Sequence, residues 1–192
     1  MRWIVVDGID GSGKSTVAHW MADRYTEEGY TVHLFVHPSE RLLGRISKAA
    51  LQSKGSIMHA IATMFFIADV LVSIRRKRKM VGPKDRVIFV RYLMGAAYLP
   101  ECLMGTGYEL FKRIIDLPPA RMLVDVLPEV ALARIEQRDH EREMFENIEG
   151  LRESRRKTLV LAEDGWLVLD NSGPVEATRV ELKVIMDRWE SS

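Results

Sequence analysis

Residues 8–15, which read Gly-Ile-Asp-Gly-Ser-Gly-Lys-Ser, constrain the fold of this 192-residue chain more than any other segment. They have the Walker A spacing of one glycine, four residues and then Gly-Lys-Ser. An unbroken apolar run at residues 3–6 precedes them, as in a central strand buried on both faces. A helical stretch follows at about residues 14–25. This order predicts an α/β fold in which the first strand ends in a phosphate-binding loop.

The residue types of this loop suit a triphosphate. Its glycines allow tight turns that direct backbone N–H groups at phosphate oxygens, and the helix that follows adds its positive dipole end. Lys14 is expected to reach the β- and γ-phosphates, and the Ser15 hydroxyl to coordinate Mg²⁺. We therefore expect ATP and Mg²⁺ as cofactors. The residues expected to bind them are Gly8, Asp10, Gly11, Ser12, Gly13, Lys14, Ser15 and Thr16.

Apolar segments of strand length alternate with helical segments along the chain, which predicts a parallel sheet flanked by helices on both faces. The expected strands span residues 3–6, 31–36, 87–90, 122–126 and 166–169. The expected helices span residues 14–25, 40–52, 56–79, 128–138, a stretch ending near 162, and 175–189. No repeat or linker divides these elements. We expect a single domain, residues 1–192, with a P-loop NTPase fold and a parallel five-stranded sheet.

Charge and composition argue against two kinds of partner. The formal net charge of +1 gives no reason to expect nucleic-acid binding. Residues 57–74 are strongly apolar and precede a basic run, but they include His59 and Asp69, which favours a buried helix over a membrane span. Cys102 is the single cysteine, so an intrachain disulfide is impossible and a cytoplasmic location is expected.

A phosphate-binding loop alone does not distinguish kinases from GTPases, motors or transporter ATPases. The chain is too short for the additional elements of most motors, and it lacks the Asn-Lys-x-Asp sequence that reads guanine. These observations favour a kinase that acts on a small molecule.

Most of the chain also resembles the thymidylate kinases, a family of nucleoside monophosphate kinases. Residues 6–16 are similar to the family's opening Glu-Gly-x-Asp-Gly-x-Gly-Lys-Ser-Thr, with Asp7 in place of the Glu. Residues 65–69 fall where the family has Phe-x-Ala-Asp-Arg, and residues 123–135 follow its fourth strand and helix. Residues 143–146 match its lid. The resemblance implies ATP-dependent phosphorylation of a nucleoside monophosphate, most closely of dTMP to dTDP.

The resemblance also implies roles for individual residues. Phe66 would stack on the acceptor base, and Asp10 would approach the 3′-hydroxyl of the acceptor sugar. Arg91, together with Tyr92, would bind the acceptor and grip its phosphate. A lid at about residues 137–146 would supply two catalytic cations and close over the site; these are Arg138 and Arg142. The loop at residues 171–174 would line the adenine pocket, and the apolar helices would form a homodimer.

Several departures from the family pattern lie on the acceptor side. Val90 stands where the family has the Asp before its arginine, and Val70 stands where it has an arginine that reads the base. His37 replaces a Glu before Pro38. The carboxylates left to replace the missing Asp are Asp7, Asp10, Asp69 and Asp125. Two alternatives therefore stay open: a kinase for another phosphorylated small acceptor, and a nucleotide-binding regulator with little transfer activity.

Overall fold

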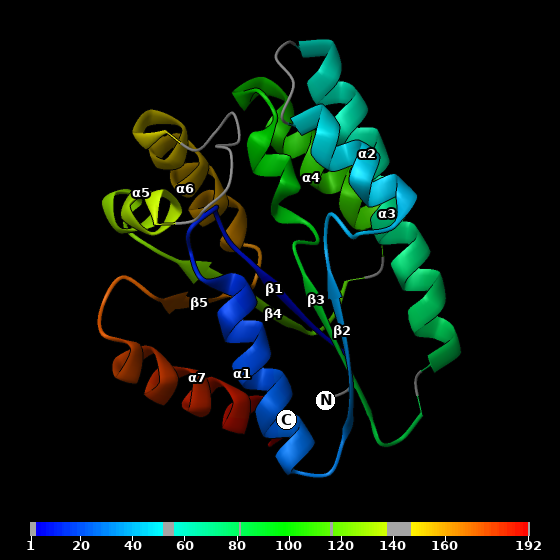
Figure 1. The fold of residues 1–192 in the computed structure, drawn as a ribbon, viewed down its shortest axis with the longest axis vertical. Coiled ribbons are helices and arrows are strands. Elements are labelled where there is room, and N and C mark those ends of the chain that lie inside the picture. Colours follow the sequence, from blue (N-terminus) through cyan, green and yellow to red (C-terminus); the bar gives the residue numbers. More distant parts are fainter. Residues whose placement is uncertain (1–2, 52–55, 81, 116, 138–146, 192) are drawn as a thin grey trace.

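The computed structural model describes residues 3–51, 56–80, 82–115, 117–137 and 147–191. Five parallel strands form one sheet in the order β2-β3-β1-β4-β5, with helices on both faces (Figure 1). The prediction of an α/β fold with a five-stranded parallel sheet is confirmed. The strands are β1 (Trp3–Asp7), β2 (Thr31–Val36), β3 (Asp85–Val90), β4 (Ala120–Asp125) and β5 (Leu167–Asp170).

The helices between these strands complete the fold. They are α1 (Lys14–Glu27), α2 (Leu42–Leu51), α3 (Ser56–Met80), α4 (Glu101–Ile114), α5 (Pro128–Glu136), α6 (Ile148–Ala162) and α7 (Val175–Glu190), with a short 3₁₀ helix, η1 (Met94–Tyr98). In the part of the chain that the structure describes, no helix is long and apolar enough to cross a membrane.

The central strands are buried on both faces, as their unbroken apolar sequences require. In β1, Ile4 and Val6 lie in a core with residues of α1 and α7, whereas Val5 lies in a core with residues of α3, α4 and α6. Side chains of a strand alternate between faces, so an all-apolar strand supplies both cores at once. All three side chains are 0% exposed.

The sequence predicted no element between residues 91 and 121, and this was wrong because η1 and α4 lie there. The buried side chains of α4, Met104, Tyr108 and Phe111, have helical spacing. Gly105 and Gly107 interrupt this pattern, and each lowers helix propensity by about 1 kcal/mol relative to alanine. Burial against the sheet outweighs that local preference.

Candidate active site

The phosphate-binding loop opens onto a cleft at the carboxyl end of the sheet. Gly13 caps α1 with φ 83°, and α1 begins at Lys14, so the first amides of the helix face the loop. The cleft has a volume of about 210 Å³. Its walls are formed by Asp10, Gly13, Lys14, Ser15, Thr16, Val36, His37, Pro38, Val90 and Arg91. Six of the residues predicted from the sequence to bind ATP or the acceptor therefore share this cleft.

Position 11 requires a glycine for two reasons, the backbone conformation and the lack of room for a side chain. Its φ of 75° lies in the left-handed region, and a Cβ added there would stand 2.5 Å from the carbonyl oxygen of Ala131 on α5. The loop therefore packs directly on the backbone of α5.

Asn171 and Arg134 hold the phosphate-binding loop in place from other segments of the chain. Neither residue was predicted from the sequence to have this role. The side-chain amide of Asn171, after β5, donates a 2.7 Å hydrogen bond to the Ser12 carbonyl. Arg134 donates to the carbonyls of Asn171 (2.9 Å) and Gly11 (3.5 Å). Arg134 follows Ala131 by three residues, so it lies on the face of α5 that contacts the loop. The three-residue spacing between Ala131 and Arg134 could have indicated from the sequence that both lie on the same face of α5.

The Asp10 carboxylate interacts with both cationic side chains of the cleft, Lys14 and Arg91. Its carboxylate lies 3.5 Å from the Lys14 ammonium, accepts a hydrogen bond from the Arg91 guanidinium, and accepts a 3.0 Å bond from the Tyr98 hydroxyl. Asp10 is 4% exposed. A buried carboxylate between two cations holds both near the loop without leaving an unpaired charge.

Arg91 reaches this position through an unusual backbone conformation. Its φ of 60° makes it the one non-glycine residue with positive φ in the described chain. Its N–H donates to the Val6 carbonyl at 3.1 Å. Non-glycine residues in this region carry about 1–3 kcal/mol of strain and are found where function requires a particular side-chain direction.

Asp7 holds the segment that follows Arg91. One of its carboxylate oxygens accepts N–H groups from Tyr92 (2.9 Å), Leu93 (2.9 Å) and Met94 (3.0 Å). The other accepts the N–H of Gly8 at 3.2 Å. Asp7 is 1% exposed and lies outside the cleft lining, so it organises backbone rather than replacing the Asp that the family has before its arginine.

Two of the other candidate carboxylates are also engaged elsewhere. Asp125 accepts two hydrogen bonds from Arg155, at 2.9 and 2.8 Å, and this pairing raises the pKa of the guanidinium. Asp69 forms a 2.8 Å ion pair with Arg41. Asp10 is therefore the candidate of the four that lines the cleft.

Phe66 and Tyr92 do not line this cleft. Both border a smaller apolar cavity between α3 and α4, together with Val70 and Phe111. Tyr92, predicted as an acceptor contact, instead packs in the core against Phe89, with ring centroids 5.2 Å apart, and is 1% exposed. Phe66 is half-buried, and its ring forms a T-shaped pair with the ring of His37, a residue that lines the cleft.

The predicted lid arginines, Arg138 and Arg142, lie outside the described residues, as does most of the lid segment.

The residues that line the cleft fit a magnesium–triphosphate complex. Ser15 and Asp10 are oxygen donors in the same cleft as Lys14, and Mg²⁺ takes few protein ligands when substrate phosphates supply the rest. Among the described residues, no group of three or more His, Cys, Asp or Glu could hold a metal alone.

Comparison with known proteins gives one consistent result. Residues 6–182 match the family model described as thymidylate kinase. The chain is 28% identical to a probable thymidylate kinase of Archaeoglobus fulgidus, over 97% of this chain and 95% of the relative. It is 30% identical to one of Pyrobaculum aerophilum, over 98% and 97%. A thymidylate kinase structure from Candida albicans superimposes with a TM-score of 0.75 at 14% identity, covering 100% of this chain and 93% of that one.

Proposed function

Because the chain belongs to the thymidylate kinase family, we infer that it transfers the γ-phosphoryl group of ATP to dTMP, which gives dTDP and ADP. One observation in the structure carries the inference. The phosphate-binding loop and its Lys14 face the same cleft as Arg91, which comes from the end of β3. A donor cradle and an acceptor-side cation in one cleft are what a phosphoryl transfer between two nucleotides requires.

On the donor side, the amides at the start of α1 and the Lys14 ammonium bind the β- and γ-phosphates. Ser15 supplies a hydroxyl ligand for Mg²⁺, which when bound neutralises the charge that develops on the phosphate oxygens. The Lys14 ammonium donates to the Ile9 carbonyl at 2.9 Å, so it is held at the loop before any phosphate contact is made. Such preorganisation limits the entropy lost on binding.

On the acceptor side, the Arg91 guanidinium binds the phosphate of dTMP. Its ion pair with Asp10 gives way to the stronger interaction with a dianionic phosphate, and Asp10 then becomes available to the sugar 3′-hydroxyl. Phe66 contributes an aromatic surface on the side of the thymine. Arg138 and Arg142 of the lid close over the transferring group and exclude water, which limits hydrolysis of ATP.

An ADP-release assay over a panel of nucleoside monophosphates and sugar phosphates tests this function, with Lys14→Ala as the inactive control. Turnover with dTMP well above the other acceptors, lost in Lys14→Ala, is the expected result. If another phosphorylated acceptor is turned over faster than dTMP, that compound is the acceptor and dTMP is not. Measurable ATP affinity without acceptor-dependent ADP release would indicate a regulator instead.

We also propose that the enzyme is a cytoplasmic homodimer and binds no nucleic acid. Its net charge is +1, and Cys102 is its single cysteine. Leu110 and Ile114 on α4 are 52% and 45% exposed, and Ile114 borders the apolar cavity against α3. A second copy that covers this face would bury both. Small-angle scattering should give the mass of two chains, and a monomeric mass would exclude the dimer.

A further inference from the structure

The imidazole of His37 is held rigidly at the edge of the cleft. His37 directly follows β2 and is 2% exposed. Its ring stacks on Phe89, with centroids 5.8 Å apart and an interplanar angle of 6°, and it faces the edge of Phe66 at 6.3 Å. Two aromatic contacts at different angles leave the ring little freedom to turn.

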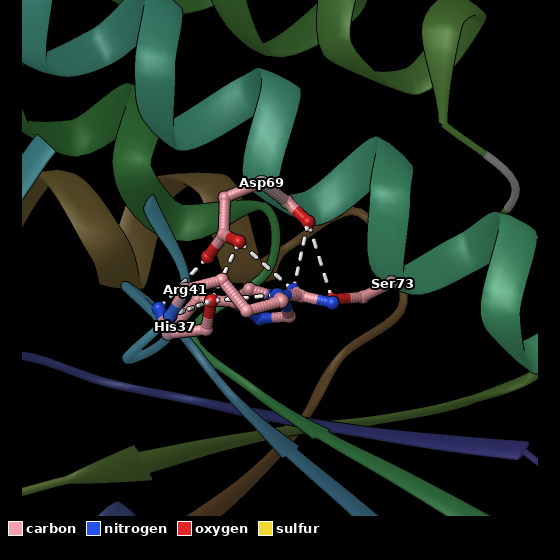
Figure 2. A network of polar contacts seen from close by, with 5 residues as sticks. His37, Arg41, Asp69 and Ser73 are labelled. Carbon is pink, nitrogen blue, oxygen red and sulfur yellow. Dashed lines mark hydrogen bonds and ion pairs between the residues drawn. The ribbon is translucent and has the colours of Figure 1, made fainter. Parts of the chain in front are cut away.

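A polar network fixes one of the two ring nitrogens (Figure 2). His37 Nε2 lies 2.8 Å from the Ser73 hydroxyl oxygen, which also accepts a hydrogen bond from Arg41. Arg41 is held in turn by the Asp69 carboxylate at 2.8 Å and by the Ser39 hydroxyl at 2.9 Å. The network joins the start of α2 to one face of α3 and leaves Nε2 fully engaged.

We assign the ring proton to the other nitrogen, Nδ1, from the hydrogen bonds around Ser73. Two acceptors lie near the single hydroxyl proton of Ser73: His37 Nε2 at 2.8 Å and the Asp69 carbonyl at 3.1 Å. Nε2 is the nearer of the two acceptors, so we assign the hydroxyl proton to the bond with Nε2. A neutral imidazole that accepts at Nε2 has its proton at Nδ1.

The surroundings keep this ring neutral. Burial lowers the pKa of His37 to about 4, and the nearby Arg41 cation acts in the same direction against the opposing effect of the Asp69 carboxylate. The backbone carbonyls of Val90 and Arg91 lie close enough to favour a proton on the ring. Neither one meets both the distance and the angle of a hydrogen bond to Nδ1. A neutral donor adds no negative charge where the acceptor phosphate enters, whereas a Glu here would.

Nδ1 of His37 is buried and has no hydrogen-bond partner among the described residues. Buried N–H groups without a partner are rare, and such a group at a ligand cleft points to a ligand atom that satisfies it. In the proposed function Arg91, in the same cleft, binds the acceptor phosphate, and the ring of His37 packs on Phe66 of α3. Resting on the proposed function, we propose that His37 Nδ1–H donates a hydrogen bond to the phosphate of the acceptor nucleotide.

Two amide substitutions separate the ring nitrogens. In His37→Asn the side-chain amide ends near the position of Nδ1, whereas in His37→Gln it reaches the position of Nε2 and the Ser73 contact. Binding of dTMP, thymidine and ATP to each variant is measured by calorimetry. We expect His37→Gln to weaken dTMP about 10- to 100-fold and His37→Asn less than about 5-fold, since a hydrogen bond to a charged group is lost only in the former. Affinities for thymidine and ATP should change less than about twofold in both variants.

The unmodified protein provides an independent measurement that does not depend on folding of a variant. With ¹⁵N-labelled histidine, the Nδ1 resonance of His37 should shift on addition of dTMP and stay in place on addition of thymidine. Equal dTMP affinities in both variants would overturn the role of His37, and so would a resonance that does not respond to dTMP. In either case, turnover of dTMP by the unmodified protein would still support the kinase function. A selective loss for ATP would assign Nδ1 to the donor phosphate and overturn the proposal. Failure of the unmodified protein to bind dTMP would overturn the proposed function itself.

Discussion

Removing the Asp7 carboxylate should destabilise the whole fold, because one side chain satisfies four backbone donors. Its oxygens accept the N–H groups of Gly8, Tyr92, Leu93 and Met94, three of them at 2.9–3.0 Å. Each buried donor left without a partner costs about 1–3 kcal/mol. Water entering the vacated space offsets part of this loss, and the four contributions are not independent. We expect Asp7→Ala to lower the free energy of unfolding by about 4 kcal/mol, a large fraction of the 5–15 kcal/mol that is typical.

Urea and thermal unfolding of Asp7→Ala, Asp7→Asn and the unmodified protein would measure this effect. For a chain of this length, each kcal/mol corresponds to about 2–4 °C in Tm, so the alanine variant should melt roughly 8–16 °C lower. Asn keeps one acceptor oxygen and should cost about half as much. Asp187→Ala serves as the control because it removes only an ion pair with Arg24 at the surface. The Asp187 side chain is 51% exposed, so this ion pair contributes less than about 1 kcal/mol to stability. A loss below about 1 kcal/mol in Asp7→Ala would refute the reasoning.

Three further predictions concern the cleft. Gly11→Ala should weaken ATP binding at least about 10-fold in calorimetry, because its Cβ would stand 2.5 Å from the Ala131 carbonyl; Gly105→Ala, which meets open space, should leave ATP affinity unchanged. Arg91→Ala should raise the KM for dTMP at least about 10-fold in steady-state assays with little change for ATP, and equal effects on both substrates would contradict its acceptor role. The unfolded state binds a proton at His37 below pH about 6.5, whereas the folded state does so only below about 4. Stability should therefore fall as pH falls through this window, and His37→Phe should flatten the fall in urea titrations between pH 4 and 7.

The donor half of the site could be predicted from the sequence because its residues are contiguous. Residues 8–16 contain the turn glycines, the ammonium and the hydroxyl in one run, and local backbone geometry places them together. The strands were predictable for a related reason. Val5 and Phe89 lie in buried strands whose apolar runs need no polar face, so their sequences differ visibly from those of the surface helices.

The acceptor half depends on contacts between distant segments, which residue patterns do not record. Asp7 reaches Met94 across 87 positions, and Tyr98 reaches Asp10 across 88. The family resemblance placed Tyr92 at the acceptor, but Tyr92 follows the positive-φ turn at Arg91 and its side chain is buried in the core. A resemblance in residue order does not record the direction of a side chain where the backbone turns.

The same turn makes one side chain, Arg91, matter both to folding stability and to the proposed acceptor binding. At φ 60° a glycine would be free of the strain that arginine carries, but Arg91→Gly would also remove a cation that pairs with the buried Asp10. The strain at Arg91 is therefore a cost in folding stability that accompanies a cation in the cleft.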